Sequence, residues 1–302
     1  MPEIVADKQT WGFPQGHEIA PGRTTLKLLG GGNRYEVYRV WDELHSSVMV
    51  AKVLRPDLVE EEYALRGLRR EIEALEALAH SVLLRSIASH IEGPYPHLLV
   101  EHLDGPTLRR LIRKDGALPA EQALPLGLHV ASAIHYMAEE GWVHLDVKPD
   151  NLVMGSSPRL IDLSLARTIE RARRLTGYIG TNAYMSPEQC NPRLDVGPPA
   201  DVWGLGATLY HAVAGRPPFR RPRTRDAGAA LEDRYPQLED EPYEWRRPVP
   251  QALSDAILAC LRKDPAERPS AGELALMLQP VSAPGRGRPL ALPRPAWHSQ
   301  RR

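Results

Sequence analysis

The densest group of chemically versatile side chains lies in the sequence HLDVKPDNLV, residues 144–153. Asp146 could accept a proton from a hydroxyl group, and Lys148 could neutralise a phosphate. Asn151 offers an amide oxygen of the kind that binds a divalent cation. Burying so many polar groups between apolar residues is costly, because each group needs a partner. The stretch therefore predicts a site for a charged ligand rather than a simple turn.

A second acidic candidate is Asp162, which follows the apolar run RLI in PRLIDLSLAR. A carboxylate at the end of a strand could join Asn151 as an oxygen ligand for a divalent ion. Taken alone, Asp162 is explained equally well as a turn cap. When Asp162 is considered together with the group at 146–151, a purely structural role explains it less well than ligand binding does.

Two features of the N-terminal third could bind phosphate. The sequence LGGGNRYEVYRV places Gly30, Gly31 and Gly32 between strand-like runs, where backbone N–H groups can approach phosphate oxygens. A flexible hairpin explains these glycines at least as well, since no helix follows them. Lys52 lies in the apolar run VMVAKVL, where its stem either reaches water or its ammonium meets an anion. Glu71, further along the chain, could orient that ammonium.

The elements that must position these groups can be read from the periodicity. The runs TTLKLLG, EVYRVWD and SVMVAKVL are bounded by Gly, Asp or Pro and predict an antiparallel meander. Residues 58–79 repeat leucine and isoleucine at three- and four-residue spacing, which predicts one amphipathic helix. Two further strand-like runs lie around SHIEG and HLLVEHL. The N-terminal third is therefore expected to be a small sheet with one major helix.

Beyond Gly105 the sequence is mainly helical. Pro125 is expected to bend its helix or to fix its start. Residues 220–250, rich in arginine, proline and acids, are predicted to form loops. The predicted helices are TLRRLIRKDG, AEQALPLGLHVASAIHYMAEEG, ADVWGLGATLYHAVAG, QALSDAILACLRKDP and SAGELALMLQP. The third of these is nearly all apolar, so it should be a buried central helix.

Composition excludes several classes of protein. A formal net charge of +0 gives no overall attraction to nucleic acid or to a membrane surface. Cys190 and Cys260 are the only cysteines, which argues against a disulfide framework or a cysteine metal site. No signal peptide is expected at the N-terminus, and no apolar run approaches the roughly 18 residues that span a bilayer. We therefore expect a cytoplasmic protein without a membrane partner, and a nucleic acid partner is not expected.

Together these motifs resemble the eukaryotic-type (Hanks-type) protein kinase family, in particular its bacterial serine/threonine branch. The resemblance extends from about Thr24 to Gln279, with the motifs in the family's order. It implies an α+β, bilobal, protein-kinase-like fold with a small antiparallel N-lobe sheet, one major N-lobe helix and a larger, mainly helical C-lobe. The motifs are LGGGNRYEVY, VAKVLRPD, LLVEHLDGPTL, HLDVKPDN, DLS, GTNAYMSPEQ, DVWGLG, GRPPF and KDPAERPS.

The resemblance also divides the chain into segments. It places a kinase domain at residues 23–280, with an N-lobe at about 23–102 and a C-lobe at about 106–280. Residues 1–22 are expected to form a loose N-terminal arm. The arginine- and proline-rich residues 281–302 are expected to be a disordered tail. This tail could touch an acidic partner, although a solvated tail is the simpler explanation.

The resemblance implies a role for each chemical candidate. Asp146 would accept the proton of the substrate hydroxyl, and Lys148 would steady the transferring phosphoryl group. Lys52, oriented by Glu71, would contact the α- and β-phosphates of ATP. The polar stretch is dense because several charges must act on one phosphoryl group.

ATP and a divalent ion are therefore the expected cofactors, and the expected partner is a protein substrate with a serine or threonine acceptor. Asn151 and Asp162 would hold Mg²⁺, with Mn²⁺ as an alternative. Val100 occupies the gatekeeper position, and Glu101 to Leu103 would present backbone groups to the adenine. The residues expected to bind the nucleotide are Gly30, Gly31, Gly32, Val37, Ala51, Lys52, Val100, Glu101, Leu103, Asp104, Asn151, Leu152 and Asp162.

Three positions depart from the family pattern. Tyr35 stands where the third loop glycine is usual, which would make the loop stiffer and bulkier. Leu163 and Ser164 replace the usual Phe and Gly after the metal-binding aspartate. Leu145 replaces the arginine that ordinarily binds a phosphate on the activation loop. Since leucine cannot make that bond, we expect the segment to hold an active shape without phosphorylation.

Because of these departures, the alternative function is a pseudokinase or an ATP-binding scaffold with weak or no transfer. Such proteins usually lack the lysine, the catalytic aspartate or the metal aspartate, whereas this sequence keeps Lys52, Asp146 and Asp162. An active kinase is therefore the expected function. Specificity for serine and threonine is expected because Lys148 is typical of that branch and Thr181 is placed to contact it.

The resemblance also predicts a structural ion pair. Glu188 in SPE and Arg268 in AERPS match partners that tie the activation segment to the C-lobe. A buried pair of this kind depends on both members, because removing one leaves an uncompensated charge.

Overall fold

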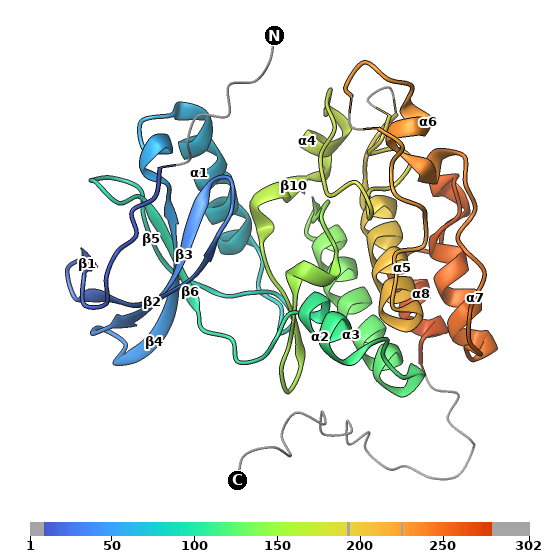
Figure 1. The fold of residues 1–302 in the computed structure, drawn as a ribbon, viewed down its shortest axis with the longest axis horizontal. Coiled ribbons are helices and arrows are strands. Elements are labelled where there is room, and N and C mark those ends of the chain that lie inside the picture. Colours follow the sequence, from blue (N-terminus) through green and yellow to red (C-terminus); the bar gives the residue numbers. More distant parts are fainter. Residues whose placement is uncertain (1–8, 192–193, 225, 280–302) are drawn as a thin grey trace. The chain divides into compact units, whose positions relative to one another are not determined.

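A computed structural model describes residues 9–191, 194–224 and 226–279 of the chain (Figure 1). The chain folds into two compact units, the first built from residues up to Ala79 and from Leu84–Leu103. The second unit contains His80–Leu83 and the chain from Asp104 onward. The expected α+β fold, with a small part built on a sheet and a larger helical part, is confirmed.

The first unit is built on one antiparallel sheet of six strands, in the order β1-β2-β3-β4-β6-β5. Helix α1, Glu62–Ala77, packs against β5 and β6 (Figure 1). Its buried face carries Leu68, Ile72 and Leu75 at three- and four-residue spacing, and Glu71 lies on the same face. The strands are β1 Glu18–Ala20, β2 Arg23–Gly31, β3 Tyr35–Asp42, β4 Ser47–Leu54, β5 Ser86–His90 and β6 His97–Glu101.

The N-terminal segment differs from the loose arm expected for residues 1–22. Residues 1–8 lie outside the described part of the chain, but residues 9–22 pack on the sheet. Trp11 donates from its indole nitrogen to the Leu54 carbonyl at 2.7 Å and from its backbone to the Glu36 carboxylate at 2.9 Å. Phe13 stacks against Trp11, with ring centroids 5.4 Å apart. Burial of these aromatic rings outweighs the glycine and proline content that suggested a flexible arm.

The second unit is mainly helical, with two small antiparallel pairs of strands. Strand β7, Trp142–Val143, pairs with β10, Arg167–Thr168, and β8, Leu152–Met154, pairs with β9, Pro158–Leu160. The α-helices of the unit are α2 Leu108–Asp115, α3 Ala120–Glu139, α4 Ile169–Arg173, α5 Pro198–Ala214, α6 Leu231–Arg234, α7 Gln251–Cys260 and α8 Ala271–Met277.

Two sequence expectations for the second unit change in the structure. Helix α3 begins at Ala120 and continues through Pro125, so that proline does not set the start of the helix. Residues 220–250, expected to be loops, contain helix α6 and a 3₁₀ turn at Pro236–Leu238. The predicted tail at 281–302 lies outside the described residues. Within the described ranges, no helix is both long and apolar enough to cross a membrane.

Helix α5 is the buried centre of the second unit, as its apolar sequence predicts. Every residue from Ala200 to Val213 is buried. Its two internal glycines allow close packing, since a Cβ at Gly204 would lie 3.1 Å from the Val147 carbonyl and one at Gly206 would lie 2.4 Å from the Cys260 Cβ. The helix therefore supports the polar stretch at 144–153 directly.

The predicted ion pair between Glu188 and Arg268 is present and buried. The two nitrogens of the Arg268 fork donate to the two Glu188 carboxylate oxygens at 2.6 and 2.8 Å. The same guanidinium donates to the carbonyls of Arg262, Lys263 and Pro199. All of its charge is thus compensated inside the unit.

Replacing Arg268 by alanine should lower the free energy of unfolding by about 3–5 kcal/mol, because Glu188 would remain as an unpaired buried charge. The urea midpoint, followed by tryptophan fluorescence, measures this loss. Arg221→Ala, at an exposed position of the same unit, is the matched control. Equal midpoints for the Arg268 variant and the wild type would contradict the structural role.

Candidate active site

In the first unit, Lys52 and Glu71 form the predicted pair. The Lys52 ammonium nitrogen lies 2.5 Å from a Glu71 carboxylate oxygen. The Glu71 side chain is fully buried, and 12% of the Lys52 side chain is exposed. Strand β4 and helix α1 therefore hold the Lys52 cation in a position where part of its side chain still reaches solvent. Such a cation can receive an anionic ligand without first losing its internal partner.

The glycine loop joins β2 and β3. The backbone N–H of Gly32 donates to the Tyr35 carbonyl at 2.9 Å, which closes the turn. A Cβ added at Gly32 would meet no heavy atom within 4 Å, so packing within the unit does not require glycine at this position. Close approach of a ligand to the backbone does explain it, and phosphate is the ligand class that exposed N–H groups favour.

Tyr35 is buried rather than part of an enlarged loop tip, with 7% of its surface exposed. Its ring centroid lies 5.0 Å from the Lys52 ammonium nitrogen. The substitution of glycine by tyrosine thus adds an aromatic wall beside the lysine, and this contact stabilises the ammonium group.

The structure corrects one of the nucleotide residues expected in β4. Ala51 lies opposite Tyr38 and belongs to the core cluster on that face of the sheet. Because side chains alternate along a strand, Val50 rather than Ala51 shares the face of Lys52. Val50 lies opposite Val100 of β6, the expected gatekeeper. Counting two residues back from the lysine would have found Val50 from the sequence.

In the hinge segment, Val100 is 3% exposed and Glu101 ends strand β6. The Glu101 backbone N–H donates to the Arg85 carbonyl, and its carboxylate accepts from the Arg85 N–H at 2.7 Å. Among the described residues, the backbone N–H of Leu103 has no hydrogen-bond partner. That donor is available to a ligand such as an adenine edge.

In the second unit, Asp201 holds the backbone of the polar stretch. Its two carboxylate oxygens accept the N–H groups of His144 at 2.6 Å and Leu145 at 2.7 Å. Burial raises the pKa of Asp201 above its ordinary value, whereas His144 and the two N–H bonds act in the opposite direction. Leu145 adopts a left-handed conformation with φ of 65°. In the sequence, Asp201 stands out only as part of the family motif DVWGLG, although an aspartate within an apolar helix is itself a usable signal.

The carboxylate of Asp146 is held by three side chains of the same unit. Lys148 donates to one oxygen at 2.6 Å, and the Thr181 hydroxyl donates to the other at 2.7 Å. Lys148 also donates to the Thr181 hydroxyl at 2.7 Å, which is the contact expected from the sequence. Asp146, Lys148 and Thr181 thus form a closed triangle, named the catalytic triangle below. The carboxylate is fixed in orientation and 6% of the residue is exposed.

Asn151 and Asp162 lie on neighbouring segments. The Asn151 amide nitrogen donates to the carbonyl and carboxylate oxygens of Asp146 at 2.9 and 3.1 Å. This orientation leaves the amide oxygen of Asn151 for a cation. The Ile161 N–H donates to the Asn151 carbonyl at 2.8 Å, which brings Asp162 beside it. Mg²⁺ is usually held by one or two protein oxygens together with phosphate oxygens, so this pair fits such an ion.

Apolar contacts hold the activation segment to Leu145, the residue that stands where the family usually has an arginine. Leu145, 3% exposed, belongs to a core cluster against which Leu175 and Ile179 pack. The Gln189 amide donates to the carbonyls of Leu145 and Ile179 at 2.9 and 2.8 Å. The buried residues of this cluster are Val143, Leu145, Ala172, Val196 and Ala200. Apolar burial therefore joins the segment to the catalytic stretch.

A basic surface on helix α2 adjoins the catalytic stretch. Arg109, Arg110, Arg113 and Lys114 line a hollow of about 620 Å³ together with Asp150 and Thr107. Arg109 pairs with Asp150 at 3.4 Å, and Asp150 directly precedes Asn151. These four cations and one carboxylate give the hollow a positive balance.

The residues predicted from the sequence divide between the two units. The first unit contains Gly30, Gly31, Gly32, Val37, Ala51, Lys52, Glu71, Val100, Glu101 and Leu103. The second contains Asp104, Asp146, Lys148, Asn151, Leu152 and Asp162. Leu152 is buried in β8 opposite Leu160, and Val37 lies opposite Lys52.

Comparison of the sequence with known proteins relates the chain to protein kinases. Residues 23–277 match the protein kinase domain family. The chain is 35% identical over 240 residues to "Serine/threonine-protein kinase PkaA" of Streptomyces coelicolor, covering 76% of this chain and 42% of that protein. It is 32% identical over 252 residues to "Serine/threonine-protein kinase PknB" of Mycobacterium leprae, covering 80% and 40%. The chain thus spans less than half the length of these relatives.

Proposed function

The chain belongs to the protein kinase family, and on that premise we propose that it transfers the γ-phosphate of ATP to serine and threonine hydroxyls of proteins. The catalytic triangle is the observation that carries this proposal. A carboxylate with both oxygens oriented and partly exposed is suited to accept a hydroxyl proton.

Phosphoryl transfer asks a protein mainly for positioning and charge compensation. Asp146 orients the acceptor hydroxyl and takes its proton, while Lys148 neutralises charge on the transferring group. Lys52, held by Glu71, binds the α- and β-phosphates. Mg²⁺, bound through the oxygens of Asn151 and Asp162, would supply further neutralisation of phosphate charge.

The preference for serine and threonine is supported by the contact of Lys148 with Thr181 and by the printed names of the relatives. Recognition of the nucleotide base is assigned to Val37, Val50, Val100 and the backbone of Leu103. Val50 is proposed in place of Ala51 because its side chain lies on the same face of β4 as that of Lys52.

Asp146→Asn should reduce phosphate transfer at least about 10²- to 10⁴-fold, because the asparagine cannot accept the proton. Lys52→Met should lose at least about 10²-fold, since a preorganised charge is removed. Transfer of labelled phosphate from Mg²⁺–ATP to a generic protein acceptor measures both. Wild-type rates in either variant would refute these roles.

The rival function is a pseudokinase, and the ring of Tyr35 beside Lys52 is the observation that favours it, because the ring narrows the space around the ammonium group. ATP binding by the wild-type chain without any transfer in the same assay would establish this rival. Transfer that Asp146→Asn abolishes would exclude it.

We infer that the activation segment is active without phosphate, because the cluster around Leu145 already anchors it. Thr176 is exposed in this segment. The ring of Tyr178 lies tilted against that of Tyr235, with centroids 5.4 Å apart, and 4.6 Å from the Arg234 guanidinium. Both ring contacts survive replacement of the tyrosine by phenylalanine.

The double variant Thr176→Ala with Tyr178→Phe should therefore transfer phosphate to an external acceptor at close to the wild-type rate. Before the rates are compared, the unfolding midpoint of the variant is measured and shown to equal that of the wild type. A loss above roughly tenfold, about 1.4 kcal/mol of lost ordering, would show that phosphate control persists by another route.

The positive hollow on α2 indicates the charge of the substrate. A protein segment that brings its acceptor hydroxyl to Asp146 passes the neighbouring residue Asp150 and the arginines around it. We infer that acidic residues near the acceptor favour transfer, because they complement these cations.

Peptides with glutamate beside the acceptor serine should be better substrates than the same peptides with lysine. Arg113→Glu should weaken this preference in kcat/KM by roughly two- to fivefold, the effect of an exposed pair worth about 0.2–1 kcal/mol. Arg262→Glu, at an exposed position outside the hollow, should leave the preference unchanged. An unaltered preference in the Arg113 variant would contradict the assignment.

A further inference from the structure

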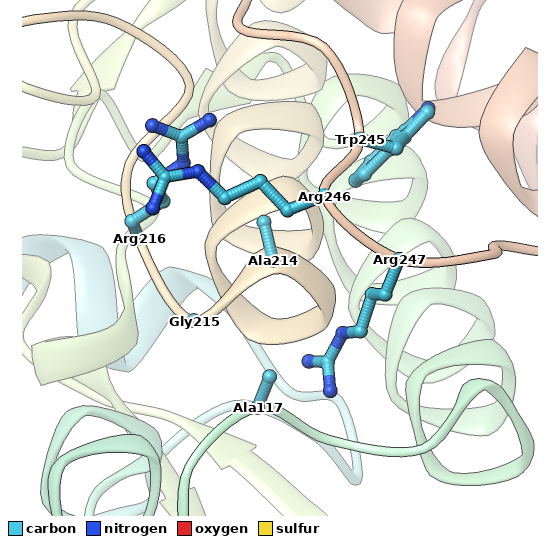
Figure 2. A pocket seen from close by; sticks show the side chains of 7 residues that line it. All are labelled: Ala117, Ala214, Gly215, Arg216, Trp245, Arg246 and Arg247. Carbon is cyan, nitrogen blue, oxygen red and sulfur yellow. The ribbon is translucent and has the colours of Figure 1, made fainter.

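A second hollow of the helical unit contains no residue of the active site. It measures about 290 Å³ and lies at the C-terminal end of α5 (Figure 2). Its lining residues are Ala117, Ala214, Gly215, Arg216, Trp245, Arg246 and Arg247. Three of these seven residues are arginines and none is acidic.

The three arginines have no carboxylate partner within ion-pair distance among the described residues. Arg216 lies over the Tyr243 ring at 4.0 Å, and Arg247 donates to the Val213 carbonyl at 2.8 Å. The side chain of Arg246 makes no hydrogen bond or ion pair within the described part of the chain. Its charge is therefore not neutralised within the described part of the chain.

Two of these three like charges, those of Arg216 and Arg246, lie near each other. Figure 2 shows Arg246 extending across Ala214 toward Arg216, while Arg247 points toward Ala117. Arg216 and Arg246 both act on the hydroxyl of Tyr210. Burial nevertheless raises the pKa of Tyr210, so this hydroxyl stays neutral and donates to the Tyr243 carbonyl at 2.7 Å. Tyr210 therefore supplies no negative charge, and bringing the guanidinium groups together costs free energy unless an anion joins them.

A hydrogen bond and ring stacking fix Trp245 in one wall of the hollow, and small residues form its floor. The Trp245 indole donates to the Ser254 hydroxyl at 2.9 Å and stacks on Tyr210 with centroids 4.5 Å apart. Ala214 and Gly215 end helix α5 and leave space above them. The carbonyl end of a helix disfavours an anion, but Arg247 already donates to the Val213 carbonyl there.

We propose that this hollow binds a phosphate monoester, held chiefly by Arg246 and Arg216. Guanidinium forks match the oxygens of phosphate, and a dianion balances several unpaired cations better than a single carboxylate. The volume is close to the lower end of the range for ligand pockets, about 300–1,000 Å³. It suits a phosphorylated side chain or free phosphate rather than a nucleotide.

The test is binding of a phosphoserine peptide to the full chain at fixed ionic strength, without ATP or Mg²⁺, by calorimetry and tryptophan fluorescence. The phosphopeptide should bind and its unphosphorylated form should not. Arg246→Gln should weaken binding at least about tenfold, equal to about 1.4 kcal/mol, while the unfolding midpoint stays unchanged. Equal binding of inorganic phosphate would identify the free ion as the ligand, and weaker binding would identify the phosphorylated chain.

Two control variants separate this site from an exposed arginine elsewhere and from the nucleotide site. Arg262→Gln, an exposed arginine after helix α7, should bind the phosphopeptide as the wild type does. Lys52→Met should also retain binding, because the ligand does not occupy the nucleotide site. Absence of wild-type binding, full binding by Arg246→Gln, or loss of binding in Lys52→Met would each overturn the proposal.

Discussion

The two hydrogen bonds that Asp201 accepts from His144 and Leu145 are the constraint on which the catalytic stretch depends. A carboxylate so deeply buried is tolerated only when its oxygens have donors, and these donors come from the backbone of the reactive loop. The bonds fix the left-handed conformation of Leu145, and with it the direction in which the next side chain, Asp146, leaves the backbone.

Each polar group that follows is held by the group before it. Asp146 accepts hydrogen bonds from Lys148, Thr181 and Asn151. The Asn151 carbonyl in turn accepts a hydrogen bond from the N–H of Ile161, which precedes Asp162. Most polar groups of this stretch therefore have the partners that a stable buried network needs, although the Nε2 atom of His144 has none among the described residues. The dense sequence HLDVKPDNLV is thus one connected network, supported from beneath by the close packing of α5.

The family resemblance was sufficient to predict the pairs Lys52–Glu71, Lys148–Thr181 and Glu188–Arg268, which the structure contains. Local periodicity was sufficient for the main helices. The resemblance misplaced the nucleotide contact at Ala51, because it identified the motif without the strand alternation that puts Val50 on the face of Lys52. Local periodicity gave no signal for the N-terminal segment. There it failed at Trp11, whose ring packs on the sheet through contacts with residues distant in sequence, such as Leu54. Long-range contacts of this kind leave no local pattern.

The apolar cluster around Leu145 has a thermodynamic consequence. An arginine–phosphate clamp weakens as salt is added, whereas burial of Leu145, Leu175 and Ile179 carries no charge and is indifferent to screening. Apolar burial has its own dependence, because its heat-capacity change makes it weaker on cooling. The order that this cluster gives the segment is therefore expected to weaken on cooling and to change little with ionic strength.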